Sequence, residues 1–266
     1  MRRLLLLPLA VAVVGLAAFG CSKSTSPAGY GTVRVALTDA PANYDSIVLH
    51  ITEVAVHRDA PDSTAGWFTV ANPDSNFDLL KLQNGVFENL GSVTVPAGHY
   101  DQVRLILGSG SYIVVDGVKH DLTVPSGMQT GLKLVGGFDV ASGGETDIGI
   151  DFDAAHSVHE TGNGKWMLKP VVHIREISTT GTISGVVSPA DPKSSVFALV
   201  GADTLSSTMT GSNGAFALTL LPAGTYNVAI DAPDAFHDTT LTGVAVTAGQ
   251  THDVGTVTLT PVAMPQ

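Results

Sequence analysis

The sequence of 266 residues contains a single cysteine, and only 6% of its residues are aromatic and 14% charged. A lone cysteine excludes an intramolecular disulfide and a metal site built on several thiolates. Lys and Arg number 13 against 24 Asp and Glu, with no basic cluster after the first three residues. This excludes a nucleic-acid partner, which requires a cationic face. No long amphipathic helical stretch occurs, whereas Gly, Pro and short runs rich in Val, Thr and Ile are frequent, which favours an all-β protein.

The N-terminus has the features of an export signal. Arg2 and Arg3 provide a positive start, and the apolar run 4–20 that follows them ends in small residues directly before Cys21. Residues 1–20 are therefore predicted to be a signal peptide, and residues 21–30 a flexible polar tether.

The segment Ala18-Phe19-Gly20-Cys21 resembles a bacterial lipobox, in which the cysteine is acylated and becomes the mature N-terminus. The resemblance implies an exported protein that is lipid-anchored to the cell envelope through Cys21. Ser22 favours the outer membrane if the host is diderm. More than one acyl chain would give stable anchoring. The alternative is ordinary signal cleavage beside an incidental cysteine.

Alternating apolar residues predict many short strands separated by turns. Asp116-Gly117 and Asn213-Gly214 predict hairpins, and Gly136-Gly137 predicts a break. A boundary near 178–181 divides the chain into two tandem β-sandwich domains, residues 31–178 and residues 180–261. The predicted strands are 32–37, 46–57, 100–107, 112–115, 118–122, 146–153, 166–177, 182–187, 195–200, 206–209, 215–218, 225–231, 240–246 and 251–259.

One short segment occurs in both predicted domains. Pro96-Ala97-Gly98-His99-Tyr100 matches Pro222-Ala223-Gly224-Thr225-Tyr226, and an alternating strand follows each. Proline presets the turn and glycine accepts a positive φ. The repeat predicts a shared turn architecture rather than a shared binding site.

The densest group of polar residues lies at the end of the predicted strand 146–153. Asp151, Asp153, His156 and His159 could gather around a divalent metal. The interpretation that we favour is a structural network in which cations from other strands pair with carboxylates. Its members are Asp39, Arg104, Lys133, Asp151, Asp153 and Lys169.

The two tryptophans, Trp67 and Trp166, are candidates for stacking on sugar rings, although packing in or beside a core is the favoured interpretation. Catalytic patterns are missing from the sequence. There is no His-Glu-x-x-His zinc pattern, no Gly-rich phosphate loop before a helix and no Gly-x-Ser-x-Gly elbow. We therefore predict that the protein is not an enzyme and carries no cofactor other than lipid on Cys21.

Several ordered motifs in residues 31–177 resemble a family of bacterial lipoproteins known as domain of unknown function 4382. The resemblance covers nearly all of this region and implies no known activity. The motifs are Leu37-Thr38-Asp39-Ala40-Pro41, Asp78-Leu79-Leu80-Lys81-Leu82-Gln83-Asn84-Gly85, Pro96-Ala97-Gly98-His99-Tyr100-Asp101-Gln102-Val103-Arg104-Leu105, Val124-Pro125-Ser126-Gly127-Met128-Gln129-Thr130-Gly131-Leu132-Lys133-Leu134, Asp151-Phe152-Asp153-Ala154 and Gly164-Lys165-Trp166-Met167-Leu168-Lys169-Pro170-Val171.

The second region resembles carboxypeptidase regulatory-like modules, which are transthyretin-like sandwiches. This resemblance implies a spacer or a binding platform, and some relatives of the broader fold bind carbohydrate. The residues that carry it are Gly181-Thr182-Ile183-Ser184-Gly185-Val186-Val187, Ser212-Asn213-Gly214-Ala215-Phe216 and Leu221-Pro222-Ala223-Gly224-Thr225-Tyr226.

Together these features predict a non-enzymatic binding or display module of the cell envelope. The expected partners are the membrane, through the lipid, and a polysaccharide or another envelope protein. Two alternatives remain at this point: a metal-binding hydrolase or sensor centred on Asp151, Asp153 and His156, and a purely structural spacer.

Overall fold

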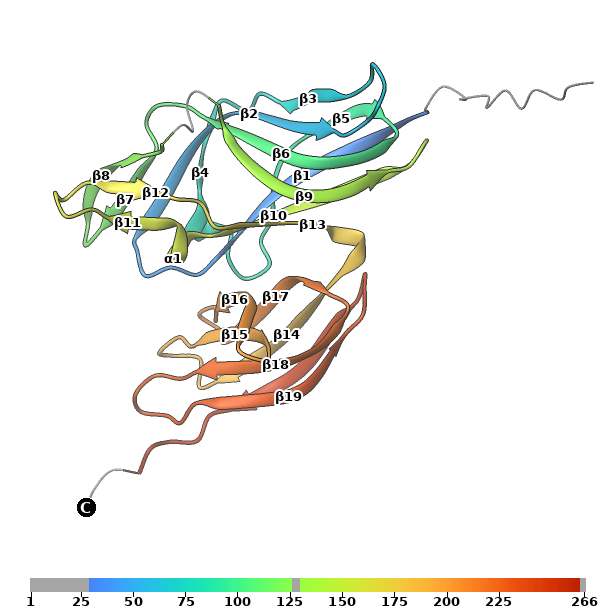
Figure 1. Cartoon of the computed structure of the whole chain (residues 1–266). Coiled ribbons are helices and arrows are strands. Elements are labelled where there is room, and N and C mark those ends of the chain that lie inside the picture. The colour runs from blue at the N-terminus through green and yellow to red at the C-terminus, as the bar shows by residue number, and fades with distance from the viewer. Residues whose placement is uncertain (1–28, 126–129, 264–266) are drawn as a thin grey trace, which may run out of the picture.

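The computed structural model describes residues 29–125 and 130–263. It consists of two strand-rich domains stacked one above the other (Figure 1). The predicted all-β fold class is confirmed. The predicted signal peptide, Cys21 and most of the predicted tether lie outside the described residues. No helix in the described part of the chain is long and apolar enough to cross a membrane.

The first domain contains two sheets that face each other. The elements of the domain, two of them short helices, are β1 (Tyr30–Ala40), β2 (Ser46–Arg58), β3 (Gly66–Ala71), β4 (Ser75–Asp78), η1 (Leu79–Lys81), β5 (Glu88–Pro96), β6 (Gly98–Leu107), β7 (Tyr112–Val115), β8 (Val118–Thr123), β9 (Leu132–Val140), β10 (Glu145–Asp153), α1 (Ala154–Ser157), β11 (Val158–Glu160), β12 (Trp166–Leu168) and β13 (Val172–Glu176). One sheet has the order β13-β10-β1-β5. The other has the order β11-β12-β8-β7-β2-β6-β9, with β3 and β4 also paired to β2.

Alternation along the strands produces the core of this domain. Val33, Val35 and Leu37 of β1 are fully buried, as are Ile148 and Ile150 on the adjacent parallel strand β10. Each strand thus contributes every second side chain to one continuous hydrophobic cluster.

Two strand predictions for the first domain were wrong. Gly136-Gly137 does not end a strand, because β9 continues through both residues. A Cβ at Gly136 would lie 2.9 Å from the Cβ of Ile174, so the glycine permits close approach to β13. The predicted strand 166–177 is split at 169–171, since β12 pairs with β8 in one sheet and β13 pairs with β10 in the other. Pro170, which has no N–H to donate to a ladder, lies at this crossing.

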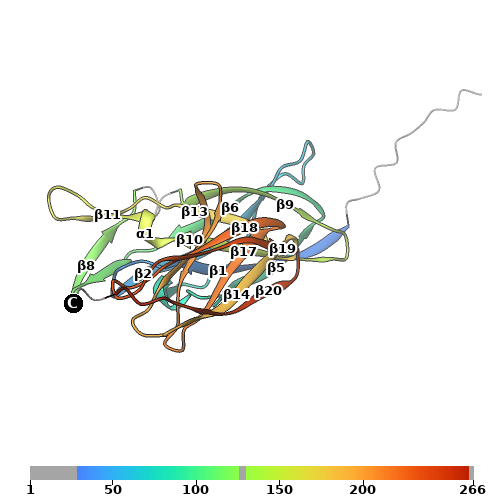
Figure 2. The same cartoon turned by 90° about the horizontal axis from the view of Figure 1, so that it is seen from below.

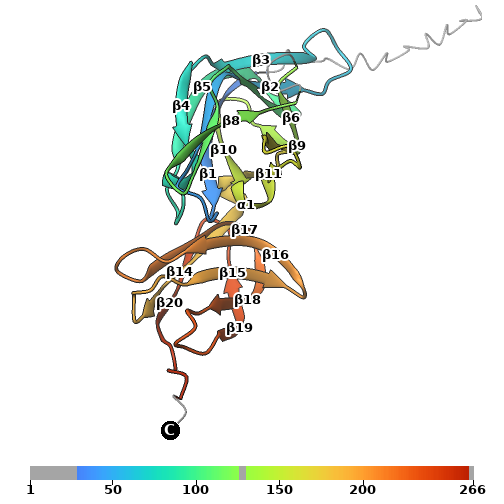
Figure 3. The same cartoon turned by 90° about the vertical axis from the view of Figure 1, so that its left-hand side faces the viewer.

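The second domain follows the short helix η2 (Ile177–Thr179) and has its own hydrophobic cluster. Its sheets have the orders β17-β14-β20 and β16-β15-β18-β19. Figure 3 shows the two domains from the side, one above the other. The strands are β14 (Thr180–Ser188), β15 (Ser195–Val200), β16 (Asp203–Met209), β17 (Ala215–Pro222), β18 (Gly224–Asp231), β19 (Thr239–Val246) and β20 (Thr251–Thr258).

The two hairpin predictions had different outcomes. Asp116-Gly117 joins the antiparallel strands β7 and β8, with φ of 50° and 74° as a two-residue turn requires. Asn213-Gly214 does not form a hairpin, because β16 and β17 belong to different sheets. This turn instead carries the chain from one layer of the sandwich to the other.

The repeated turn makes the same tyrosine hydrogen bond in both domains, although Gly98 has a positive φ of 143° and Gly224, contrary to the prediction, does not have a positive φ. The hydroxyl of Tyr100 donates a hydrogen bond of 2.7 Å to the carbonyl of Pro96, and the hydroxyl of Tyr226 donates one of 2.7 Å to the carbonyl of Pro222. Both tyrosine rings are buried. The repeat therefore encodes a corner that ties each turn to its following strand.

Two contacts dock the domains against each other. Leu220, which is 4% exposed and has φ of 56°, rests on Gly149 of β10, where a Cβ would lie 2.7 Å from its Cδ2 atom. Asn84 of the first domain bonds the edge of β17: its Oδ1 accepts from the N–H of Ala217 at 2.6 Å, and its Nδ2 donates to the carbonyl of Ala215 at 3.2 Å. The Asn84 side chain thus takes the place of a neighbouring strand.

Candidate functional site

Three of the predicted polar residues do come together, at the end of β1 and β10. The parallel register pairs Thr38 with Asp151 and Ala40 with Asp153, which places Asp39 between them. Asp39 is 4% exposed, and its Oδ1 accepts a hydrogen bond of 3.2 Å from the N–H of Ala154. Burial raises the pKa of Asp39 well above its ordinary value, and the charges of Asp151 and Asp153 raise it further.

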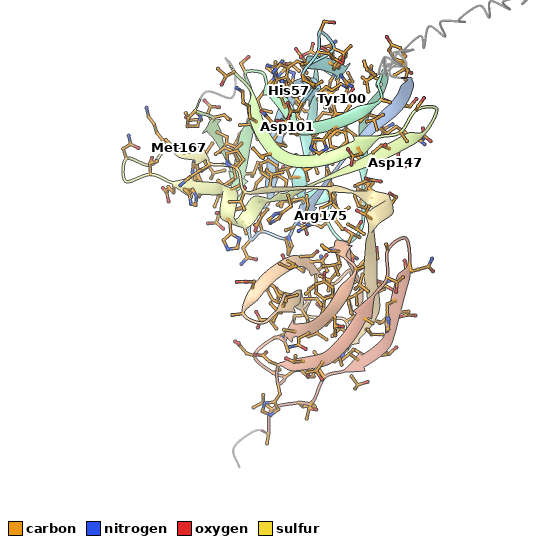
Figure 4. The ribbon with its side chains drawn as sticks, turned by 45° about the vertical axis from the view of Figure 1, so that its right-hand side comes forward. His57, Tyr100, Asp101, Asp147, Met167 and Arg175 are labelled. Atoms are coloured by element: carbon orange, nitrogen blue, oxygen red, sulfur yellow. The ribbon has the colours of Figure 1, made fainter. Side chains whose placement is uncertain are left out.

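Asp151 shares this environment. Burial raises its pKa to about 6, the charge of Asp153 acts in the same direction, and the charge of Arg175 opposes them. Arg175 of β13 lies at the boundary between the domains (Figure 4). Its charge also opposes the rise that burial causes in the pKa of Tyr226 of the second domain. This acidic corner is an arrangement of crowded carboxylates with one nearby cation.

The metal-ligand set proposed from the sequence is not assembled. Asp153 caps α1, accepting from the N–H of His156 at 3.1 Å and lying 2.7 Å from its Nδ1 atom. The turn of α1 leaves the His156 side chain 77% exposed, and His159 is exposed on β11. Within residues 29–125 and 130–263, no group of three or more His, Cys, Asp or Glu side chains could hold a metal ion.

The predicted cations of the polar network lie elsewhere. Arg104 and Lys133 are paired neighbours on β6 and β9, and the guanidinium of Arg104 lies 3.6 Å from Glu53. Among the described residues, neither Lys133 nor Lys169 forms an ion pair with a carboxylate. The predicted pairs of Arg104 and Lys133 with the aspartates were therefore wrong, because β6 and β9 belong to the sheet opposite β10. Lys169 is exposed on the segment between β12 and β13.

The two tryptophans occupy different surroundings. The ring of Trp67 on β3 is covered by the Arg104 guanidinium, 4.2 Å from the ring centroid, and contacts His57 at 5.0 Å between centroids. His57 in turn bonds Asp101 at 2.7 Å, on the face of the sheet seen in Figure 4. The cation therefore occupies one side of Trp67 where a sugar ring would stack.

Trp166, by contrast, lines a cleft of about 450 Å³. The cleft lies between β8 and the start of β12, whose parallel pairing is limited to two residue pairs. The ring is half-buried, with Tyr44 edge-on at 5.8 Å and His120 at 5.9 Å between centroids. The remaining lining residues are Lys119, Asp121, Thr123, Gly164 and Lys165. An aromatic surface beside convergent polar groups is a typical small-ligand site.

Comparison with known protein families assigns the first domain to a family. The family described as "Domain of unknown function (DUF4382)" matches residues 30–170, more than half of the chain. The chain belongs to this family. A second family, the carboxypeptidase regulatory-like domain, matches residues 182–260, which follow the DUF4382 domain. No curated protein matches the chain.

Solved structures similar to this DUF4382 protein share little sequence with it. A cohesin–X-dockerin complex from Acetivibrio cellulolyticus is 26% identical over 32% of this chain, with a TM-score of 0.27, and the match spans 60% of that chain. The minor pilin GBS52 of Streptococcus agalactiae is 12% identical and has a TM-score of 0.23, with 88% of this chain and 98% of that chain covered. The Bacillus anthracis TIE protein is also 12% identical with a TM-score of 0.23, over 88% of this chain and 34% of that chain.

Sequence reasoning missed three structural features of the DUF4382 protein. Arg175 was not recognised as the cation of the acidic corner, although it alternates with His173 on a strand beside Asp151. The position of Asn84 had a signal in the sequence, because Asn-Gly favours a turn with positive φ, and Asn84 has φ of 59°. The polar partners of Trp166 come from β8, some forty residues earlier, and only the parallel β8–β12 pairing joins them.

Proposed function

We propose that this protein is a non-enzymatic binding or display module of the bacterial cell envelope, held to a membrane by lipid on Cys21. The DUF4382 domain follows the tether directly, and the carboxypeptidase regulatory-like domain extends from it. In this arrangement the protein presents its surfaces to a partner outside the membrane.

The observation that carries the proposal is the docking of the two domains. Leu220 against Gly149 and Asn84 against the β17 edge hold the second domain in one position relative to the first. In Figure 1, β1 begins in the upper part of the first domain and the described chain ends at the far side of the second. A lipid a few residues before β1 would thus leave the second domain directed away from the membrane.

The proposal is also supported by the hydrogen bonds that the acidic and histidine side chains already make within the protein. Asp153 caps a helix, His57 is bonded to Asp101, and Asp39 bonds a backbone N–H. Catalysis of acyl or phosphoryl transfer would instead need a nucleophile beside a free base.

Acyl labelling tests the tether. Cells producing the full chain are fed an alkyne analogue of palmitate, and we expect label on the wild-type protein and none on the Cys21→Ser variant. The wild-type chain should partition into detergent and the variant into the aqueous phase. A wild-type protein that reacts fully with a thiol reagent and stays in the aqueous phase would contradict the proposal.

A purely structural spacer shares this tether and differs in having no ligand. Substitutions that fill the Trp166 cleft would leave a spacer unaffected, whereas they would weaken a binding module.

A further inference from the structure

The cleft beside Trp166 combines an apolar ring with charged groups of mostly one sign. We propose that it binds an acidic polysaccharide, a chain of sugars that carry carboxylate groups. This inference rests on the proposed function, which places the domain in an envelope where such polymers occur.

The ring supplies the surface that a sugar needs. Trp166 is held from two sides by Tyr44 and His120, so its orientation is set before any ligand arrives. The C–H face of a pyranose packs on an indole ring with little loss of solvation, because both surfaces are apolar. Thr123 and Asp121, on the same cleft wall, are available to hydrogen-bond sugar hydroxyls.

The charge of the cleft differs from that of the protein. The chain has 13 Lys and Arg against 24 Asp and Glu, yet the cleft lining contains Lys119 and Lys165 and a single carboxylate, Asp121. The Lys119 ammonium lies 3.7 Å from the Tyr112 ring centroid. In the described chain the sole lysine in an ion pair is Lys81, so both cleft lysines keep their charge available for an anion.

The site is accessible in the two-domain protein. Seen from below, the end of the first domain that carries β8 and β11 projects beyond the second domain (Figure 2). Met167, next to Trp166 on β12, lies at this end in Figure 4, far from Arg175 at the domain boundary. A polymer could therefore pass across the cleft without meeting the second domain.

The two tryptophans provide the test. Trp67→Phe leaves Trp166 as the only tryptophan, and Trp166→Phe leaves Trp67, which lies under Arg104. The lipid-bearing full chain in detergent micelles is titrated with alginate, a polymer of uronic acids, and separately with neutral dextran of matched length. We expect alginate to change the fluorescence of the Trp67→Phe variant and to leave the Trp166→Phe variant unchanged.

Affinity measurements then separate the contribution of the Trp166 ring to alginate binding from that of the lysine charges. Trp166→Ala should weaken alginate binding at least about tenfold. The double variant Lys119→Gln/Lys165→Gln should weaken it by about fivefold or more and reduce its dependence on salt. The matched control is Lys81→Gln/Lys193→Gln, which removes the same charge at exposed positions outside the cleft and should bind like wild type. Trp166→Ala removes a half-buried ring and can therefore destabilise the first domain as well as weaken binding. The lysine variants change only side chains at the surface, so they test the site without disturbing the core.

Each contrary result has a distinct meaning. Equal binding of dextran and alginate would overturn the acidic ligand class. Alginate binding that survives every cleft substitution would overturn the site while leaving a binding module in place. Absence of binding by either polymer would overturn the proposal, and acyl labelling of Cys21 would still decide the envelope tether separately.

Discussion

The turn at Pro96 and the turn at Pro222 share four of five residues, with His99 in the first and Thr225 in the second, and the same tyrosine hydrogen bond, but their surroundings differ. In the first, Arg58 is 6% exposed and its guanidinium donates to the carbonyl of Ala97 at 2.9 Å. Gly98 has φ of 143°, and a Cβ there would lie 2.7 Å from the Arg58 Nη2 atom. In the second, a Cβ at Gly224 would meet nothing closer than 3.7 Å. The four shared residues thus determine the tyrosine corner, and the surrounding residues determine how much change the corner tolerates.

The two domains also differ in which polar side chains they bury. The first buries charged side chains, Asp39 and Arg58, whereas in the second the buried polar side chains are hydroxyls, such as Ser194 and Thr210. A buried hydroxyl is satisfied by one or two hydrogen bonds, while a buried charge makes stability depend on its neighbours and on pH.

The largest contrast is expected between Gly98→Ala and Gly224→Ala. The first forces an unfavourable φ and a clash with Arg58, so the free energy of unfolding should fall by about 3 kcal/mol. The second should cost less than about 1 kcal/mol. Urea unfolding followed by tryptophan fluorescence reports the first domain, which contains both tryptophans, and circular dichroism reports the whole chain. Equal losses would show that the surroundings of the turn are unimportant.

Asp151→Asn tests the charge burial of the first domain. The pKa of Asp151 in the folded chain, about 6, lies above its ordinary value of 3.8, so the folded state retains a proton that the unfolded state releases between these values. The free energy of unfolding therefore falls as the pH rises through that window and stays lowered above it. At pH 7 the variant should be more stable than wild type by about 2 kcal/mol. At pH 3 the gain should vanish, and a gain of the same size at both pH values would contradict the assignment.

Asn84→Ala and Asn213→Ala compare the two Asn-Gly segments. Asn84 joins the domains, whereas Asn213 bonds the N–H of Ala215 within its own turn at 3.1 Å. Asn84→Ala should cost about 1–2 kcal/mol and speed hydrogen exchange at the Ala217 amide. The Asn213 variant should leave that amide protected. Unchanged exchange at Ala217 in the Asn84 variant would argue against docking in solution.

Tyr100→Phe and Tyr226→Phe should have the smallest and most similar effects. Each removes a single 2.7 Å hydrogen bond to a proline carbonyl, which is worth about 1 kcal/mol. Calorimetry of both variants checks the prediction. A loss confined to one domain would show that the shared sequence does not perform a shared task.

Strands that alternate regularly could be predicted from the sequence, and β7 was predicted at its observed bounds. β5 was missed because Gly91, with φ of 142°, interrupts its alternation at a bulge against β1. β9 was missed because its two glycines indicate a turn in isolation and close packing in the folded chain. Of the candidate sites, Trp166 was named from the sequence, but its cleft was not.

The sequence by itself determined the all-β class and the repeated turn, because alternation and turn chemistry are local properties of the chain. The resemblance to the two families was carried by ordered motifs. Only the tertiary structure decided that Arg104 and Lys133 lie in the sheet opposite the acidic corner, that Asn84 completes the edge of β17, and that Lys119 and Lys165 share a cleft. These arrangements depend on which strands pair across long separations, and that pairing is set by the burial of whole sheets rather than by any short segment.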